Sequence, residues 1–101
     1  MSISVTELRH ALARSVTVAD DALTAELADG RTITVPLAWF PRLVHGTPTE
    51  RSNWRLIGGG EGIHWPDLDE DISVESLLAG RSSAETAESL RRWLQSRNQN
   101  Q

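Results

Sequence analysis

The stretch that decides the fold is "SVTVADDALTAELADGRTITVPL", residues 15–37. Apolar and polar residues alternate through three short runs, and an alternation of period two is typical of strands with one buried face. Asp20-Asp21 separates the first two runs and Asp29-Gly30 separates the last two. An Asp-Gly pair favours a tight hairpin turn, because glycine and aspartate tolerate positive φ. The stretch therefore predicts a three-stranded antiparallel meander.

The segments on either side of the meander carry helix signals. Before it, Ser4 stands three residues ahead of Glu7. This is the spacing of a capping box, and it predicts a short helix over 5–13. After it, Pro41 and Gly46 bracket another short helix, since proline is favoured in the first turn of a helix and glycine just past its end.

A second strand pair follows. Thr47 and Glu50 form a further capping box and predict a helix that begins at Pro48. The segments "WRLI" (54–57) and "IHW" (63–65) then read as two strands joined by a glycine-rich turn. The fold class predicted is α+β, with an antiparallel β-meander and a second hairpin packed with several short α-helices.

The C-terminal part of the chain is predicted to be helical. Ser73 is expected to cap a short helix that ends before Gly80, a position where left-handed backbone is common. We expect residues 1–81 to form one α+β domain with its N-terminal helix. The capping-box spacing of Ser82 and Glu85 predicts a C-terminal helix over 82–97 that packs on the same domain, and 98–101 are expected to fray.

The composition points to a soluble cytoplasmic protein that does not bind membranes. The chain has 101 residues, no cysteine and a net charge of −4. The lack of cysteine excludes disulfides and thiolate metal sites. No apolar run approaches the roughly 18 residues that a membrane span needs. The acidic balance argues weakly against unspecific binding to nucleic acid.

The glycine-rich run at 58–62 could be a phosphate loop or a turn. A dinucleotide loop needs G-x-G-x-x-G between a strand and a helix. Here Ile63 occupies the place of the third glycine, a strand is expected next, and the chain has no lysine for a Walker loop. We therefore interpret the run as a wide hairpin turn.

The acids that follow resemble the start of a calcium loop, D-x-D-x-D, at Asp67, Asp69 and Asp71. The match fails where the loop needs glycine and a bidentate glutamate, because Ile72 and Leu78 stand there. The simpler interpretation places Asp69, Glu70, Asp71 and Glu75 at a helix N-terminus, where negative charge is stabilised.

Catalysis is not expected, and neither a cofactor nor a metal is predicted. The chain has no cysteine and no G-x-S-x-G elbow for a nucleophile. One alternative stays open: a metal-dependent enzyme that uses His64 and the nearby carboxylates, since these groups are adequate ligands.

Four blocks of sequence resemble a known bacterial family. They are the Asp-Gly-Arg turn, the Trp-Phe-Pro-Arg-Leu block, the Gly-Ile-His-Trp-Pro step and the Leu-Asp-Glu-Asp-Ile run, all within residues 15–81. Together they resemble the domain of unknown function 2442. The resemblance implies a small α+β domain and transfers no catalytic residue.

The resemblance also implies two associations. Family members are often encoded beside another small protein, in an arrangement like that of toxin–antitoxin pairs. Some members carry a helix-turn-helix domain after this one, but only some twenty residues follow Gly80 here. A DNA-associated regulator therefore remains an alternative, while direct binding to nucleic acid is not expected.

We therefore expect a non-catalytic, antitoxin-like interaction module. Its partner would be a protein, and a toxin-like protein encoded beside it is one candidate. Self-association into a homo-oligomer stays open. The candidate contact region is the acidic stretch 61–75 with two tryptophans, because acids and aromatics suit a basic partner. Both tryptophans have an alternative place in the core. The candidate contact residues are Trp54, His64, Trp65, Asp67, Asp69, Glu70 and Asp71.

Overall fold

The first sheet confirms the predicted meander. A computed structural model describes residues 11–99. Its first three strands pair antiparallel in the order β1-β2-β3. They are β1 (Ala13–Val18), β2 (Ala22–Leu27) and β3 (Thr32–Pro36). The predicted inward-facing positions are buried at Val16, Leu23, Ala25, Leu27 and Val35, because successive strand residues point to opposite faces.

The outward face of the meander is polar, as the alternation predicts. Thr24 lies opposite Thr34 on the neighbouring strand, and their hydroxyls are 3.1 Å apart. The Asp29-Gly30 turn joins β2 and β3 as predicted, but its type differs. Only Gly30 has positive φ (+94°), and its N–H donates to the Leu27 carbonyl. This is the pattern of a three-residue loop with one left-handed glycine.

The second sheet has one strand more than predicted. It contains β4 (Arg55–Ile57), β5 (Gly62–Trp65) and β6 (Glu70–Ser73), paired antiparallel in the order β4-β5-β6. The expectation that the acids of this region crowd a helix N-terminus is therefore wrong for Glu70 and Asp71. Both lie in β6, opposite Trp65 and His64 respectively.

The predicted helix caps are mostly confirmed. The short helices are η1 (Leu37–Trp39), α2 (Pro41–Val44), α3 (Pro48–Ser52) and α4 (Val74–Leu78). Thr47 and Glu50 form the capping box of α3, and the Ser73 hydroxyl accepts the Ser76 N–H at the start of α4. After α4, Gly80 has φ +72°, and the Arg81 N–H donates to the Ser76 carbonyl, which closes a Schellman motif.

The glycine-rich run is a turn, as predicted. Gly58, Gly59 and Gly60 form the short helix η2 between β4 and β5, and all three have positive φ. Gly60 has a further reason to be glycine. A Cβ there would lie 2.7 Å from the Ala13 carbonyl oxygen, so this turn fits closely against the start of β1.

The predicted N-terminal helix lies almost entirely outside the described residues. Of residues 5–13, the structure describes only the last three: Ala11 and Leu12 have no regular structure, and Ala13 begins β1. The helical prediction is therefore wrong for these three residues. The strand pairing of Ala13 with Leu27 decides the conformation there.

The C-terminal helix begins later than predicted. α5 runs from Ala87 to Gln99, and the Thr86 hydroxyl accepts the Ser89 N–H at its start. The predicted capping box of Ser82 with Glu85 is wrong, because the Glu85 carboxylate is bound by Arg42. The helix continues to Gln99, two residues beyond its predicted end.

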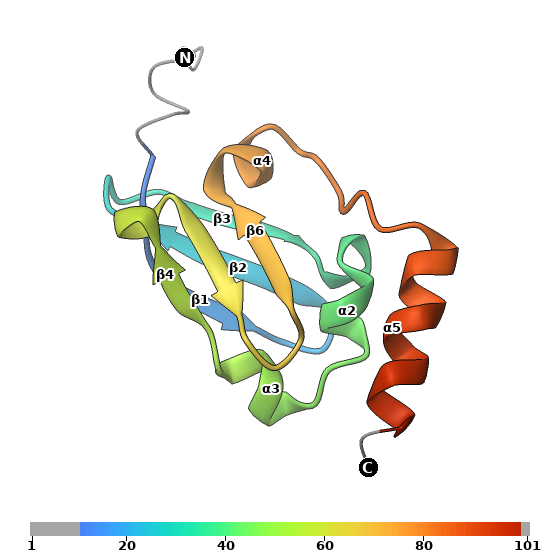
Figure 1. The fold of residues 1–101 in the computed structure, drawn as a ribbon. Coiled ribbons are helices and arrows are strands. Elements are labelled where there is room, and N and C mark those ends of the chain that lie inside the picture. Colours follow the sequence, from blue (N-terminus) through green and yellow to red (C-terminus); the bar gives the residue numbers. More distant parts are fainter. Residues whose placement is uncertain (1–10, 100–101) are drawn as a thin grey trace.

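The two sheets stack with the core between them, β4–β6 lying in front of β1–β3 in Figure 1. Buried side chains of both sheets form one cluster, which includes Leu23, Leu27, Ile63, Trp65 and Ile72. The α+β class is thus confirmed. Among the described residues, no helix combines the length and apolar character needed to cross a membrane.

Candidate functional site

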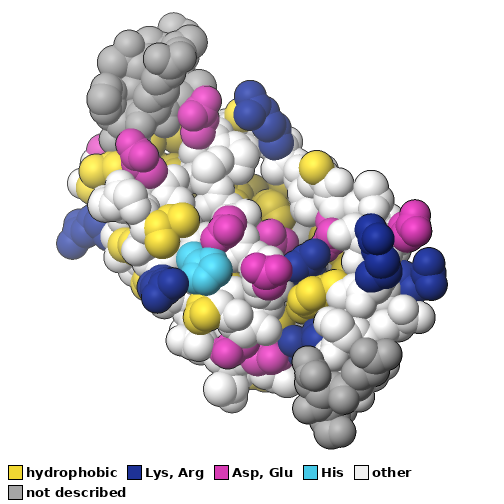
Figure 2. Space-filling model, in the orientation of Figure 1, with side chains coloured by type: hydrophobic (Ala, Val, Ile, Leu, Met, Phe, Trp, Pro, Cys, Tyr) yellow, Lys and Arg dark blue, Asp and Glu magenta, His cyan; other side chains and the backbone are white. Residues whose placement is uncertain are grey.

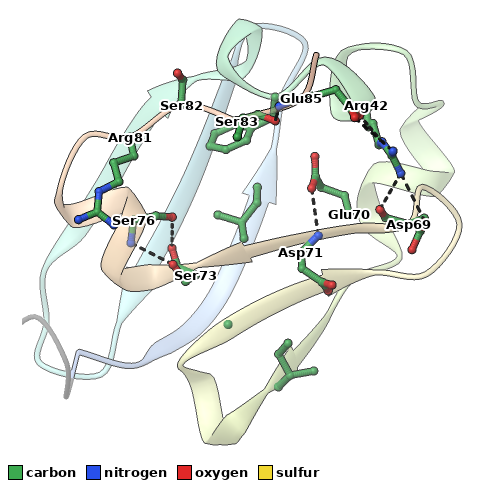
Figure 3. Close-up of a pocket in the computed structure, with 15 residues that line it drawn as sticks. Arg42, Asp69, Glu70, Asp71, Ser73, Ser76, Arg81, Ser82, Ser83 and Glu85 are labelled. Atoms are coloured by element: carbon green, nitrogen blue, oxygen red, sulfur yellow. Dashed lines mark hydrogen bonds and ion pairs between the residues drawn. The ribbon is translucent and has the colours of Figure 1, made fainter. Parts of the chain in front are cut away.

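A groove runs beside β6. It lies between this strand and the segment 81–86, which runs from α4 to α5, and has a volume of about 750 Å³. Figure 3 shows Glu70 pointing into it, with Ser83 and Glu85 on the opposite wall and Ser73 and Ser76 at the far end. Buried Phe40 and Ile72 supply apolar lining.

The groove follows the free edge of the second sheet. β6 is the outer strand of β4-β5-β6. The Val74 N–H, just after β6, donates inward to the Glu61 carbonyl, whereas the Asp71 N–H meets the Glu70 side chain at 3.1 Å. Backbone groups of alternate residues point to opposite sides of an antiparallel strand. The main-chain groups of Asp71 and the Ser73 N–H therefore face away from β5, toward the groove, while the Ser73 carbonyl accepts the Ser76 hydroxyl at 2.8 Å.

The outer wall of the groove is held in place by specific contacts. The Ser83 N–H donates to the Trp39 carbonyl at 2.9 Å. Glu85 receives two hydrogen bonds from Arg42 and one from the Ser89 hydroxyl. Because the segment 81–86 is tied to η1, α2 and α5, the groove is formed before any partner arrives.

α5 is attached to the rest of the fold mainly through cations and one tryptophan ring. The guanidinium groups of Arg42 and Arg97 lie 5.1 and 4.8 Å from the centre of the Trp93 ring. Arg97 also pairs with Glu50 of α3 at 2.8 Å. The cation–π contact of Arg42 with Trp93 and the charge-assisted pair of Arg97 with Glu50 hold α5 beside α2 and α3, whereas Arg97 and Trp93 both belong to α5.

Two glutamates of the groove have opposite electrostatic surroundings. The hydrogen bonds from Arg42, followed by that from Ser89, hold the pKa of Glu85 below its usual value. Burial raises the pKa of Glu70, and the nearby Glu85 and Asp71 carboxylates add to the effect. Arg42 and the Asp71 N–H only partly oppose it. Glu70 forms no ion pair with any residue in 11–99, so it is the groove's unmatched carboxylate.

Replacing Glu70 by glutamine is expected to stabilise the free protein at pH 7. A folded-state pKa above the unfolded value means that ionised Glu70 costs folding free energy at high pH. The cost disappears as the pH falls through the raised pKa. We expect Glu70→Gln to raise the melting temperature at pH 7 by about 2–5 °C, and this gain to shrink in acid. Thermal unfolding measured from pH 7 to pH 3 checks both the higher melting temperature at pH 7 and its decrease in acid.

Glu85→Gln is the matched control, and its effect should have the opposite sign. The lowered pKa of Glu85 means that its ionised form stabilises the fold above the unfolded pKa, and that this stability is lost as the pH falls through the lowered value. Glu85→Gln should therefore lower the melting temperature at pH 7. Equal effects of the two substitutions would contradict this description of the groove.

The structure divides the seven candidate contact residues. Asp69, Glu70 and Asp71 line the groove. Trp65 is fully buried and its indole N–H donates to the Arg51 carbonyl. The hypothesis that Trp65 belongs to a contact surface is therefore wrong for this fold, and its alternative place in the core is correct. Trp54 is half-buried against the core cluster.

His64 and Asp67 do not line the groove, and both have partners within the chain. His64 points away from the core, and its Nδ1 lies 2.5 Å from an oxygen of Asp71. Asp67 accepts a hydrogen bond from Asn53, while Asp69 lies at the β5–β6 turn with φ +49° and faces Arg42 at 3.5 Å. Within residues 11–99, no three His, Cys, Asp or Glu side chains converge in a way that could hold a metal ion.

Several groove residues were not predicted from the sequence. They are Phe40, Arg42, Ser76, Arg81, Ser83 and Glu85. The serine-rich segment "RSSAE" (81–85) indicates the loop that forms the outer wall, since such a segment between helices is typical of a loop. The long-range pairing of Arg42 with Glu85 leaves no trace in the local pattern.

The fold and the groove can now be compared with known proteins. Residues 13–83 match the model of the family described as "Protein of unknown function (DUF2442)". The chain belongs to this family. The match covers both sheets and stops before α5. The comparison with curated proteins gave no match.

Two solved structures share the DUF2442 fold of this chain. A protein of unknown function from Rhodospirillum rubrum is 23% identical, with a TM-score of 0.64 over 75% of this chain and 94% of its own. An uncharacterized protein from Chromobacterium violaceum is also 23% identical, with a TM-score of 0.62 over 80% of this chain and 74% of its own. At this identity the likeness concerns the fold alone.

Proposed function

We propose that this DUF2442 domain is a non-catalytic protein-interaction module that binds a basic partner protein through β6 and its neighbouring acids. The observation that carries the proposal is Glu70, a half-buried carboxylate without an ion pair in the described chain, beside outward-facing main-chain groups of β6. A charge held in this way costs folding free energy and gains most from a partner that supplies a cation.

The charge distribution supports a basic partner. Figure 2 shows acidic side chains gathered near the middle of this face, beside a hollow in which hydrophobic side chains are visible. Asp69 and Asp71 are exposed on either side of Glu70. Such an arrangement speeds the encounter with a positively charged surface and selects against acidic ones. The first partner to test is the small protein that family members are often encoded beside, in an antitoxin-like role.

Co-expression with the neighbour-encoded protein tests this proposal. We expect a stoichiometric complex that survives affinity capture and size-exclusion chromatography with light scattering. Asp69→Asn with Asp71→Asn should weaken the complex about tenfold at low salt, and asparagine tolerates the left-handed backbone at position 69.

The control pair removes the same amount of charge elsewhere. Glu26 lies on the outward face of the meander and Glu88 in the first turn of α5, and both are exposed. Glu26→Gln with Glu88→Gln should leave the affinity within about threefold. If the chain elutes alone from co-expressing cells, or if both pairs weaken binding equally, the proposal is refuted.

A further inference from the structure

We propose that the partner docks by adding an extended segment to the free edge of β6, with a basic side chain that reaches Glu70. This inference rests on the proposed function and specifies how the module would bind. Strand addition uses main-chain hydrogen bonds for affinity and side-chain pockets for specificity. The groove offers both.

The main-chain hydrogen bonds of an added strand would come from the outward-facing backbone groups of β6. Asp71 presents its N–H and carbonyl to the groove and Ser73 its N–H, since the inward hydrogen bonds belong to the alternate residues. The Ser73 carbonyl already accepts the Ser76 hydroxyl at 2.8 Å. The Asp71 N–H is met only by the side chain of the adjacent Glu70, at 3.1 Å. A basic side chain that draws Glu70 into an ion pair would release this N–H for an added strand.

The space for an added strand already exists. The opposite wall, 81–86, has no regular secondary structure and is anchored by Ser83 and Glu85. The groove between this wall and β6 is lined by the hydroxyls of Ser73 and Ser76 and by apolar Phe40 and Ile72. A segment of alternating polar and apolar residues fits such a lining, because its side chains point to opposite faces.

The negative charge along the β6 edge favours a segment of another protein over a second copy of this chain. Two copies paired through β6 would bring Asp69, Glu70 and Asp71 of one copy close to those of the other. Like charges across paired strands are destabilising. The arginine nearest to Glu70, Arg42, is already bound to Glu85. The groove therefore favours a different polypeptide that carries lysine or arginine.

A peptide selection on the full chain tests the inference. A phage-displayed library of random twelve-residue peptides is selected on immobilised protein, and the enriched peptides are titrated into ¹⁵N-labelled protein. We expect a lysine or arginine within a run of strand-forming residues, and shifts of the Asp71 and Ser73 amides. Selection on Glu70→Gln should lose the basic residue, and the wild-type peptides should bind it about tenfold more weakly.

Two substitutions at one position separate main-chain from side-chain contacts. Asp71→Ala and Asp71→Pro both remove the carboxylate, but only proline removes the outward N–H and fills its place with a ring. Proline is tolerated on the open side of an edge strand, and the ¹⁵N spectrum confirms that each variant is folded. We expect Asp71→Ala to bind the peptide within about threefold of wild type and Asp71→Pro to lose at least tenfold.

The outcomes distinguish this inference from the proposed function. If the partner complex forms but Asp71→Pro binds as well as Asp71→Ala, strand addition is wrong and the interaction module stands. If neither partner nor peptide binds, both are wrong. If wild type is a dimer and Asp71→Pro is a monomer, a second copy occupies the edge and the inference is overturned.

Discussion

Trp65→Ala is expected to remove a large part of the stability of the protein. The Trp65 ring is completely buried between the two sheets. Truncating a buried tryptophan costs about 3–5 kcal/mol, since both the transfer of the ring and the remaining cavity contribute. Domains of this size have a total stability of about 5–15 kcal/mol. For a stability in the middle of this range we expect the urea midpoint to fall by about a third to a half, measured by tryptophan fluorescence and circular dichroism.

Trp65→Phe separates the contribution of the apolar ring from that of the indole hydrogen bond. Phenylalanine retains most of the apolar volume but leaves the Arg51 carbonyl without its indole donor, which is 3.0 Å away in the wild type. The expected cost is about 1–2 kcal/mol. If Trp65→Ala left the urea midpoint unchanged, the ring would not be part of the core, and its role as a contact residue would have to be reconsidered.

Arg51→Met is expected to be the second most damaging change, at about 2–3 kcal/mol. Arg51 is the one buried charged residue among residues 11–99. Its guanidinium donates to the Leu43 and Val44 carbonyls, both at 2.8 Å, and thereby caps the end of α2. Methionine fills much of the same space but donates nothing, so denaturant unfolding should show the loss of these two bonds.

The ion pair of Arg51 with Asp20 should contribute little by comparison. The Asp20 side chain is 97% exposed, and exposed ion pairs are typically worth less than about 1 kcal/mol. Asp20→Asn is therefore expected to shift the unfolding free energy by no more than about 0.5 kcal/mol. If Asp20→Asn proved as costly as Arg51→Met, the ion pair rather than the capping of α2 would be the source of stability.

These two residues also position the groove. Trp65 and Arg51 are joined by a hydrogen bond, and together they hold α2 and α3 against β5. α2 carries Arg42, which closes one end of the groove by binding Glu85. The folding core and the candidate site are thus connected through one helix. Variants that test binding therefore need a separate measurement of folding.

The meander could be predicted from sequence because its signal is local. The period-two alternation from Val16 to Leu37 marks the strands, and each turn lies beside the strands that it joins. The caps at Thr47 and Ser73 are also local, since each satisfies an N–H three residues away. Short-range patterns of this kind can be recognised in a single sequence.

β6 and the groove could not be predicted because their causes are distant in sequence. Glu70 and Asp71 have low strand propensity, and only their pairing with β5 makes the segment a strand. Acids on an edge strand also discourage uncontrolled pairing. The Ser82–Glu85 pattern was misleading because Glu85 binds Arg42, 43 residues earlier in the chain. The predicted acidic stretch includes Asp69, Glu70 and Asp71, which line the groove, while the opposite wall of the groove was not predicted.

Hydrogen–deuterium exchange on the co-expressed complex shows which elements the partner covers. We expect binding to slow exchange at β6 and in 81–86, and to leave the outer strand β1 of the other sheet unchanged. Slower exchange confined to α5 or the meander, with β6 as accessible as in the free chain, would contradict this expectation.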